Sequence, residues 1–477
     1  MSFRLWYANN QSQDVLKKAL SDQFGKLTVT ETLIAGIPHA MIASAEQNEE
    51  TLDFNSPEAI ANAETRSFCR RILQMNHLPV IEKETTLCPL REYSVFVANL
   101  QPFKISRKEA RGGNASEWTA VHYNENDKEV KRVFQGARNA IQSLGLDFGA
   151  VHLSINREKG QVVVLDIDSA PTMTVKTAKE LAQVIHKLAE TPYSQKSLML
   201  GADPEFLLAY KDTNKLAAAS HFFPRTGTIG CDNIRLPNRQ DRPIAEVRPT
   251  PNECPMELTR TIQQNLKEAN KTAPFKNLKM VAGSQPIATH AIGGHIHFGG
   301  VQASSKLLRA LDNYLAIPVL MLENPVSATK RRQRYGLLSD FRTKEHGFEY
   351  RTLPSWLISP AYAQGILCAA KLIALNYTRL RLNIFLSAAA QESFYTAQKM
   401  YFKQHVAEVW DTLMALPEAE NYTVPLTAMK EASQAMTAWD ELSDIRVAWH
   451  LGAPKKIYRA TTGPKKPAAT RVTVRVR

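Results

Sequence analysis

The alternation of apolar and polar positions gives the first part of the chain a mixed pattern. Residues 91–108 (REYSVFVANLQPFKISRK) alternate in two runs, which is typical of two strands, whereas residues 130–146 place apolar side chains at helical spacing. Residues 160–171 (GQVVVLDIDSAP) are a short apolar run, as expected for a buried strand. Strands mixed with helices predict an α+β layer.

The second part of the chain repeats apolar strand patterns separated by helical stretches. Helical spacing occurs near 255–270 and 303–322, and it dominates from residue 360 to about residue 448. The strand candidates between these stretches are SLMLGADPEFLLAY, PIAEVRPTP, ATHAIGGHIHFGG and HGFEYRTLPSW. We predict a sheet with flanking helices.

A break in pattern between Ala189 and Ser197 (AETPYSQKS) separates the two parts. A chain of 477 residues is too long for one core, so two domains are expected. We assign 1–195 to the first domain and 196–451 to the second. Residues 452–477, rich in Lys, Pro and Thr, are expected to form a basic flexible tail.

The net charge of +13 changes this picture less than its size suggests. Eight of these charges lie in residues 452–477, which contain no Asp or Glu, and the rest of the chain carries the remaining +5. The tail is therefore the part expected to contact a polyanion, with strong salt dependence. A hydrophobic content of 44% excludes a chain that is disordered along most of its length.

Neither the apolar runs nor the cysteines indicate a membrane or a secreted protein. No segment offers the roughly 18 uncharged apolar residues that a membrane span requires. The five cysteines include no CxxC pair, which indicates reduced thiols. We expect a soluble, cytoplasmic protein, in the host cytoplasm if the chain is phage-encoded, without a membrane partner; the oligomeric state stays open.

Each of the four strand candidates of the second part carries two polar residues two positions apart. This spacing puts both side chains on the same face of a strand. Buried charges are costly unless they are paired or bound to a metal, so four such pairs predict one concave sheet face around a polar cavity. The pairs are Asp203/Glu205, Glu246/Arg248, His295/His297 and Glu349/Arg351.

A less specific interpretation competes for each pair. Asp203 and Glu205 flank a proline, which is typical of an edge strand, and the two Glu-x-Arg pairs could be ordinary ion pairs on a surface. The His-x-His pair is harder to explain by packing, because two histidines face the same way after two glycines. The four pairs together favour an active site.

The residue types at these positions suit divalent cations and phosphate. Carboxylates with imidazoles favour Mg²⁺ or Mn²⁺, and the four strand candidates have no thiolate where a zinc site would need one. Arginines stabilise charge on a phosphoryl group in transfer. The arginines expected in this catalytic role are Arg248, Arg334, Arg342 and Arg351.

The strings GADPEF, AEVRPTP, GGHIHFGG and YG.....R....GFEYR occur in this order over roughly 150 residues. In this arrangement the chain resembles the phage-type COOH-NH2 ligase (amidoligase) branch of the glutamine synthetase superfamily. The resemblance implies a curved antiparallel sheet with flanking helices. It also implies that Asp203, Glu205, Glu246, His295 and Glu349 hold the metal ions.

The same resemblance implies that His297 and Arg351 contact the phosphates of ATP. The cation-rich segment 327–345, with Arg334, is expected to be a loop that covers them. Asp203 stands where glutamine synthetase has a Glu, and the ammonium-site residues of that enzyme are not found. The amine substrate need not be ammonia.

The first part resembles a shortened ATP-grasp domain in LPV (78–80), REYSVFV (91–97) and VVVLDIDSAPTM (162–173). The positions of the ATP-grasp metal triad correspond to His152, Asp166 and Asp168, all different in type from the usual residues. A glycine-bearing RGGN string at 111–114 follows the wrong strand for the nucleotide lid. A degenerate scaffold and a second ligase site are both open.

These observations favour an ATP-dependent carboxylate-amine ligase that uses Mg²⁺ or Mn²⁺. The resemblance implies amide formation through an acyl phosphate on an amino-acid or peptide substrate. Two alternatives stay open. One is a non-catalytic virion or nucleic-acid-associated protein that retained a ligase fold, which would explain the tail. The other is an HxH metallohydrolase, for which further histidine ligands are not found in matching strands.

Overall fold

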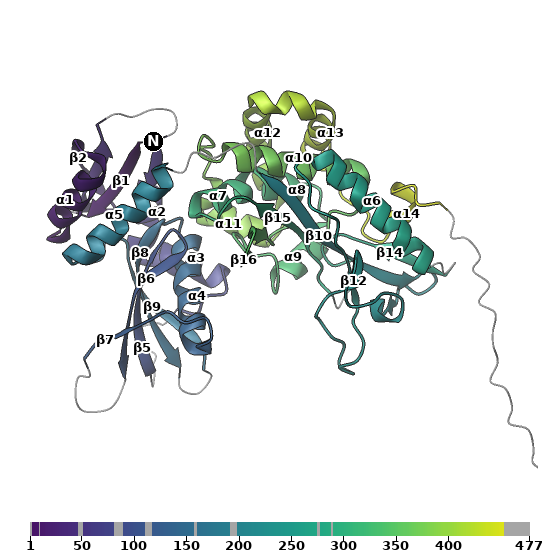
Figure 1. Ribbon diagram of the computed structural model, residues 1–477, viewed down its shortest axis with the longest axis horizontal. Helices are drawn as coiled ribbons and strands as arrows, with labels where there is room; N and C mark the ends of the chain where they lie inside the picture. The colour runs from purple at the N-terminus through teal and green to yellow at the C-terminus, as the bar shows by residue number, and fades with distance from the viewer. Residues whose placement is uncertain are drawn as a thin grey trace, which may run out of the picture.

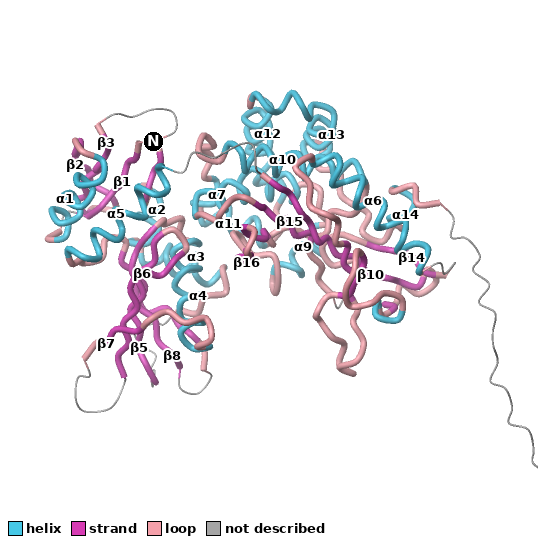
Figure 2. The backbone as a smooth tube through the Cα atoms, viewed as in Figure 1, coloured by secondary structure: helices cyan, strands magenta, loops and turns pink. Residues whose placement is uncertain are grey.

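The computed structural model describes residues 2–8, 10–45, 51–80, 89–109, 117–156, 160–190, 198–273, 277–287 and 290–452. Helices and largely antiparallel sheets are mixed throughout these ranges, which confirms the predicted α+β class. The two halves of the chain lie side by side, each with its own sheets (Figures 1 and 2). The RGGN string at 111–114 and all of the tail except Gly452 lie outside the described residues.

The first half contains two sheets, with strand orders β2-β3-β1-β4 and β7-β6-β5-β8-β9. Neighbouring strands are antiparallel except β1 and β4. The strands are β1 (Phe3–Ala8), β2 (Leu27–Ile34), β3 (Ile37–Ser44), β4 (Leu52–Phe54), β5 (Pro89–Ala98), β6 (Gln101–Glu109), β7 (Thr119–Val121), β8 (Phe148–Asn156) and β9 (Val162–Asp168). The helices are α1 (Ser12–Phe24), α2 (Pro57–Glu64), α3 (Arg66–Met75), α4 (Lys128–Ser143) and α5 (Val175–Glu190).

Helix α4 is positioned by its cap and by its apolar stripe. The Asp127 carboxylate accepts hydrogen bonds from the backbone N–H groups of Glu129 and Val130, which the first turn leaves without partners. Buried residues at helical spacing, including Val133 and Ile141, pack on the five-stranded sheet. The two strands, the helix and the β9 strand predicted in the first half are thus confirmed.

The second half is built on an eight-stranded sheet with the main order β12-β13-β10-β15-β17-β16; β11 and β14 also pair with β10. The strands are β10 (Met199–Tyr210), β11 (Leu216–Ala217), β12 (Ile229–Cys231), β13 (Ile244–Val247), β14 (Leu278–Val281), β15 (Gly294–Gly299), β16 (Phe341–Lys344) and β17 (Gly347–Tyr350). All their pairings are antiparallel. The four predicted strands correspond to β10, β13, β15 and β17.

Helices cover one face of this sheet and continue to the end of the described chain. The helices are α6 (Pro255–Thr272), α7 (Ser305–Leu311), α8 (Ile317–Leu320), α9 (Pro325–Arg332), α10 (Pro360–Asn376), α11 (Ala388–Tyr395), α12 (Lys399–Met414), α13 (Thr423–Gln434) and α14 (Ile445–Ala448). A π-helical segment, η3 (Asp312–Ala316), joins α7 to α8, and the short 3₁₀ turns are η2 (Ala219–His221), η4 (Ile384–Leu386) and η5 (Pro417–Tyr422).

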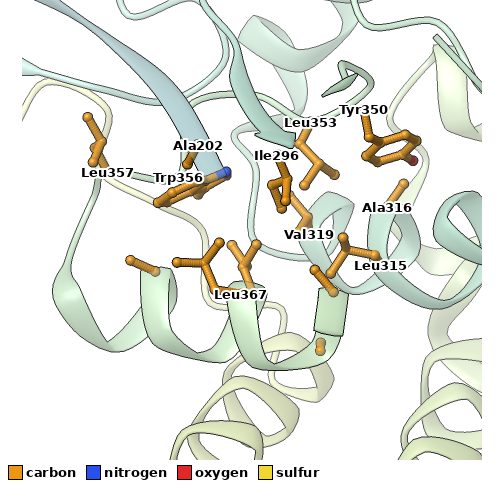
Figure 3. Packing of buried hydrophobic residues seen from close by; sticks show 14 of the residues in the cluster. Ala202, Ile296, Leu315, Ala316, Val319, Tyr350, Leu353, Trp356, Leu357 and Leu367 are labelled. Atoms are coloured by element: carbon orange, nitrogen blue, oxygen red, sulfur yellow. The ribbon is translucent and has the colours of Figure 1, made fainter. Parts of the chain in front are cut away.

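The core of the second half lies between this sheet face and α10. Figure 3 shows Ala202, Ile296 and Tyr350 from three neighbouring strands among helix residues such as Val319 and Leu367. All five are 6% exposed or less. Because side chains alternate along a strand, the residues between these positions must face the other side of the sheet.

The two halves meet along a seam that several polar contacts cross. Arg309 forms an ion pair with Asp147, and Asn76 Nδ2 donates a hydrogen bond of 2.7 Å to Gln391 Oε1. Arg71 on α3 pairs with Glu392 on α11. The predicted boundary near residue 195 falls in 191–197, outside the described residues, and the exact domain bounds stay a prediction.

Among the described residues no helix is both long enough and apolar enough to cross a bilayer. Four of the cysteines lie in the described ranges, and each has a free thiol: Cys69, Cys231, Cys254 and Cys368.

Candidate active site

Strand register brings the predicted metal ligands together on the face opposite the core. Asp203 on β10 lies directly across from His295 on β15, and Glu205 lies across from Glu246 on β13. On the other side of β15, Glu349 of β17 is the partner of His297. The two-residue spacing noted in the sequence therefore corresponds to one shared polar face, as predicted.

A cavity of about 530 Å³ opens on this face. It contains all five predicted metal ligands and three of the four predicted arginines. The lining residues that the sequence predicted are Asp203, Glu205, Glu246, His295, Glu349, Arg334, Arg342 and Arg351. Two predicted residues, His297 and Arg248, do not line it.

Three of the five ligands form a compact group. Asp203, His295 and Glu349 each offer one ligand atom, and these atoms lie within 4.8 Å of one another. His295 Nδ1 is 2.9 Å from Asp203 Oδ1 and 3.4 Å from Glu349 Oε1. Two carboxylates and an imidazole at this spacing, all at most partly exposed, fit Mg²⁺ or Mn²⁺.

Glu205 and Glu246 lie beside this group and have different partners. Glu205 Oε2 accepts a hydrogen bond of 2.7 Å from the backbone N–H of Gly293. Glu246 forms an ion pair with Arg248, whose guanidinium also donates to backbone carbonyls. For this pair the less specific interpretation, an internal ion pair, describes the geometry, and the prediction of Arg248 as a phosphate contact gains no support from it.

Burial and mutual repulsion perturb the titration of these groups. Burial raises the pKa of Glu205 to about 7, and burial together with the nearby Asp203 raises the pKa of Glu246 to about 8. Burial alone would lower the pKa of His295, but the carboxylate of Asp203 raises it to about 9. Burial alone would raise the pKa of Asp203, but His295 holds it well below its usual range.

Glu349 is the point where most of the cations converge. Its carboxylate is 1% exposed, and Arg351 Nε lies 3.2 Å from Oε1. Arg342 Nη1 is 3.3 Å and Lys344 Nζ is 2.9 Å from the other oxygen, Oε2. A buried carboxylate surrounded by cations and an imidazole is placed to bind a metal ion or to orient cations toward phosphate.

Comparison with known proteins identifies the family of the chain. Residues 200–451, more than half of the chain, match the family described as phage phiEco32-like COOH.NH2 ligase-type 2. The chain belongs to this family. By its description the family consists of ligases that join a carboxylate to an amine. The matched range contains every residue predicted for the site. No curated protein matches the chain.

Solved structures with a likeness to this family member include an ATP-grasp ligase, a macrocyclase and a glutathione synthetase. The ATP-grasp ligase PsnB with its minimal precursor is 15% identical over 30% of this chain and 66% of its own, with a TM-score of 0.23. The macrocyclase MdnB from Microcystis aeruginosa MRC is 12% identical over 39% of this chain and 98% of its own, with a TM-score of 0.26. The bifunctional glutathione synthetase from Pasteurella multocida is 11% identical over 54% of this chain and 48% of its own, with a TM-score of 0.33.

Several residues at the family member's site were missed in the sequence: Tyr335, Asp232, Asn233 and His290 line the cavity, and Lys344 contacts Glu349. The hydroxyl of Tyr335 contacts His295 Nε2 and lies 3.4 Å from Arg351 Nη2. Tyr335 precedes Gly336 in the YG string that supported the resemblance, so the string itself marked the position. Only the folded segment shows that Tyr335 lines the cavity beside His295.

The segment 327–345, predicted as a covering loop, is not one loop. Its first part belongs to α9 and its last part to β16. Arg331 on α9 is fully buried and donates three hydrogen bonds, of 2.7 to 2.9 Å, to the carbonyls of Ile292, Thr352 and Leu353. It holds the backbone in place rather than facing a substrate. Arg334 and Arg342 do reach the cavity.

The triad positions of the first half lie together but outside this cavity. His152 pairs in register with Asp166, and Asp168 follows two residues later on the same face of β9. All three are exposed, and the His152 ring is 6.1 Å from that of Trp118. Whether this face is a degenerate scaffold or a second ligase site stays open.

The perturbed groups predict an unusual response of stability to pH. Glu205 and Glu246 keep protons in the fold that they lose near pH 4.5 when unfolded, so the free energy of unfolding should fall as pH rises toward 8. His295 contributes stability below pH 6.5, which is lost as pH rises through about 9. Each group changes stability by at most about 1.4 kcal/mol per pH unit in its window.

Bound Mg²⁺ or Mn²⁺ should reverse this fall, because metal binding displaces protons from its ligands. The measurement is the melting temperature between pH 6.5 and 9, in EDTA and with excess Mg²⁺. Glu205→Gln, which cannot ionise, should flatten the slope in EDTA. Identical pH profiles with and without metal would contradict the assignment.

Proposed function

We propose that this chain is an ATP-dependent carboxylate-amine ligase that forms an amide or peptide-like bond on an amino-acid or peptide substrate. One observation carries the proposal. The 530 Å³ cavity combines the ligand group of Asp203, His295 and Glu349, which one sheet face presents, with Arg334, Arg342 and Arg351 in its lining. This is the set of groups that phosphoryl transfer to a carboxylate requires.

The expected cofactor is Mg²⁺ or Mn²⁺, with Asp203, His295 and Glu349 as its holders and Glu205 and Glu246 as neighbours able to bind a second ion. When bound, the ion would neutralise phosphate charge. The remaining roles belong to side chains at the site. Tyr335 contacts His295 at Nε2 and would orient the ring, whereas Nδ1, which lies 2.9 Å from Asp203, is the nitrogen left to face an ion shared with that carboxylate.

The arginines are assigned to the transferring phosphoryl group. Arg351 is about one-fifth exposed and Arg342 about half exposed, so both can reach a ligand in the cavity. Arg334 lines the same cavity from the segment after α9. Their charges would be attracted to phosphate oxygens and stabilise the transition state.

The reaction then has two steps. In the first, a substrate carboxylate oxygen attacks the γ-phosphorus of ATP, the bond to the β-phosphate oxygen breaks, and ADP leaves. In the second, the amine nitrogen attacks the carbonyl carbon of the acyl phosphate, and phosphate leaves. Water must be kept from the acyl phosphate, because hydrolysis would release the starting carboxylate.

The test is mass spectrometry of an amino-acid and peptide pool incubated with the full chain, ATP and Mg²⁺. We expect pairs of compounds to be consumed and a product to form at their summed mass less one water, with ADP formed in step. Omitting ATP, or using Glu349→Gln, should remove the product. ADP release without any condensation product from any pool would argue against a ligase.

The HxH metallohydrolase gains no support from the geometry. Such a site would use both histidines as ligands, but His297 is outside the cavity lining and stacks on His346 at 5.6 Å.

A further inference from the structure

A second cavity, of about 190 Å³, lies at the seam between the two halves. The first half contributes residues of α4, among them Arg138 and Gln142. The second half contributes the segment 334–341 and the region around Asn383. Arg334 and Tyr335 line both this cavity and the metal-ligand cavity, so the two spaces adjoin. We call the second space the seam cavity.

Arg138 lines the seam cavity, where the Asp340 carboxylate acts on its charge from beyond ion-pair distance. It forms no ion pair or hydrogen bond with any described residue, and its Nε is buried. Its guanidinium lies 5.6 Å from the ring centre of Phe134 and 4.6 Å from that of Phe341, so both rings contribute cation–π contacts. A partly buried guanidinium that lacks an ion pair is placed to bind an anionic ligand that enters the cavity, and we take Arg138 as such a site.

Asp340 is the complementary group. Its carboxylate also forms no ion pair or hydrogen bond within the described part of the chain, although it lines the same cavity. Its backbone carbonyl accepts a hydrogen bond of 2.8 Å from the N–H of Arg351, a residue that lines the metal-ligand cavity. Asp340 therefore lies between the seam cavity and the metal-ligand group.

The other charged groups that line the seam cavity are already used or shared. Asp312 accepts hydrogen bonds from Ser339 and Tyr350, and Arg309 pairs with Asp147. Arg334 faces both cavities. One further acceptor is unused: the Oε1 of Gln142 is buried without a partner. Among the described residues that line the seam cavity, Arg138 is thus a cation without an ion pair, and Asp340 and Gln142 each offer an acceptor oxygen without a hydrogen bond.

We propose that the seam cavity binds the amine substrate, and that this substrate is an α-amino acid. Its carboxylate would pair with Arg138, and its amino group would lie toward Asp340 and Gln142. A volume below the roughly 300 Å³ typical of drug-sized pockets suits a single amino acid rather than a nucleotide. The orientation of the amino group toward the active site rests on the proposed function. Binding of the amino acid in the seam cavity does not require catalysis.

Asp340 then has a chemical role. The ammonium group would give one proton to the Asp340 carboxylate, which frees the nitrogen lone pair to attack the acyl carbon. The C–N bond forms as the bond from carbon to the phosphate oxygen breaks. The second proton on nitrogen leaves with the departing phosphate, and the products are the amide, phosphate and protonated Asp340.

The test measures binding to the full chain without ATP, by thermal shift and by calorimetry. The probes are the standard L-amino acids one at a time, with the decarboxylated amine and the N-acetyl derivative of each amino acid that binds. We expect at least one amino acid to raise the melting temperature, and both derivatives to bind at least about tenfold more weakly, because each lacks one of the two charged groups.

Arg138→Gln and the isosteric Asp340→Asn should each weaken that binding at least about tenfold. Arg132→Gln is the matched control, since Arg132 is an exposed arginine on the same helix that does not line the seam cavity. The Mg²⁺-dependent gain in stability should be retained in Arg138→Gln, which would show that the fold and the metal site are intact.

The outcomes separate the two proposals. Binding of no amino acid by the wild type, or equal binding by Arg138→Gln, overturns the seam-cavity assignment even if condensation occurs. Amino-acid binding that depends on Arg138, in a protein that never forms a condensation product, supports the seam cavity and counts against the ligase.

Discussion

Glu349→Gln should reduce ADP formation and amide formation by about 10²-fold or more, while the fold is retained. The substitution keeps the shape of the side chain but removes the negative charge on which His295, Arg351 and Lys344 converge. A cation would lose one of its three clustered ligands. The measurement is ADP and product per unit time, with circular dichroism and a melting curve to verify folding.

Asp166→Asn is the control for this experiment. Asp166 is exposed on the first half's sheet, paired in register with His152 and outside the cavity. If that sheet is a scaffold, the change should have little effect. Full activity in Glu349→Gln together with loss in Asp166→Asn would transfer the chemistry to the first half.

His295→Ala should raise the Mg²⁺ or Mn²⁺ concentration needed for half-maximal activity by about 10- to 100-fold. His295 is 4% exposed and lies within the three-residue ligand group. His297→Ala should change this requirement less, because its Nε2 only approaches Asp203, at 3.1 Å. By the family resemblance it should chiefly raise the KM for ATP.

The readouts are ADP formation across a metal titration and, independently, the gain in melting temperature on adding metal. The second readout reports binding without turnover. Equal metal dependence in the two variants would be incompatible with the different positions of the two rings.

The sequence was sufficient to predict the strands and the shared face of the site. Strand spacing is local, so Asp203/Glu205 and His295/His297 could be placed on one side of a sheet before its strand order was known. The family strings then supplied the order in which the strands contribute. The cavity lining agrees with these predictions for eight of the residues.

What the sequence could not supply depends on contacts between segments far apart. Nothing local marks Arg138 as facing Phe341, because the two lie in different halves of the chain. In the same way, whether an arginine meets a carboxylate, a carbonyl or a cavity depends on packing. Arg248 forms an ion pair with Glu246, Arg331 donates hydrogen bonds to three carbonyls, and Arg334 lines the cavity.

Alternation along β10 and β15 also limits how such a protein can diverge. Because neighbouring residues face opposite sides, inserting or deleting one residue in β10 would exchange Asp203 and Glu205 with core residues such as Phe206. Length changes should therefore be tolerated in connecting segments and not in these strands. New substrate preferences would arise by replacing the walls of the two cavities, Arg138 among them, while the ligand spacing on the sheet stays fixed.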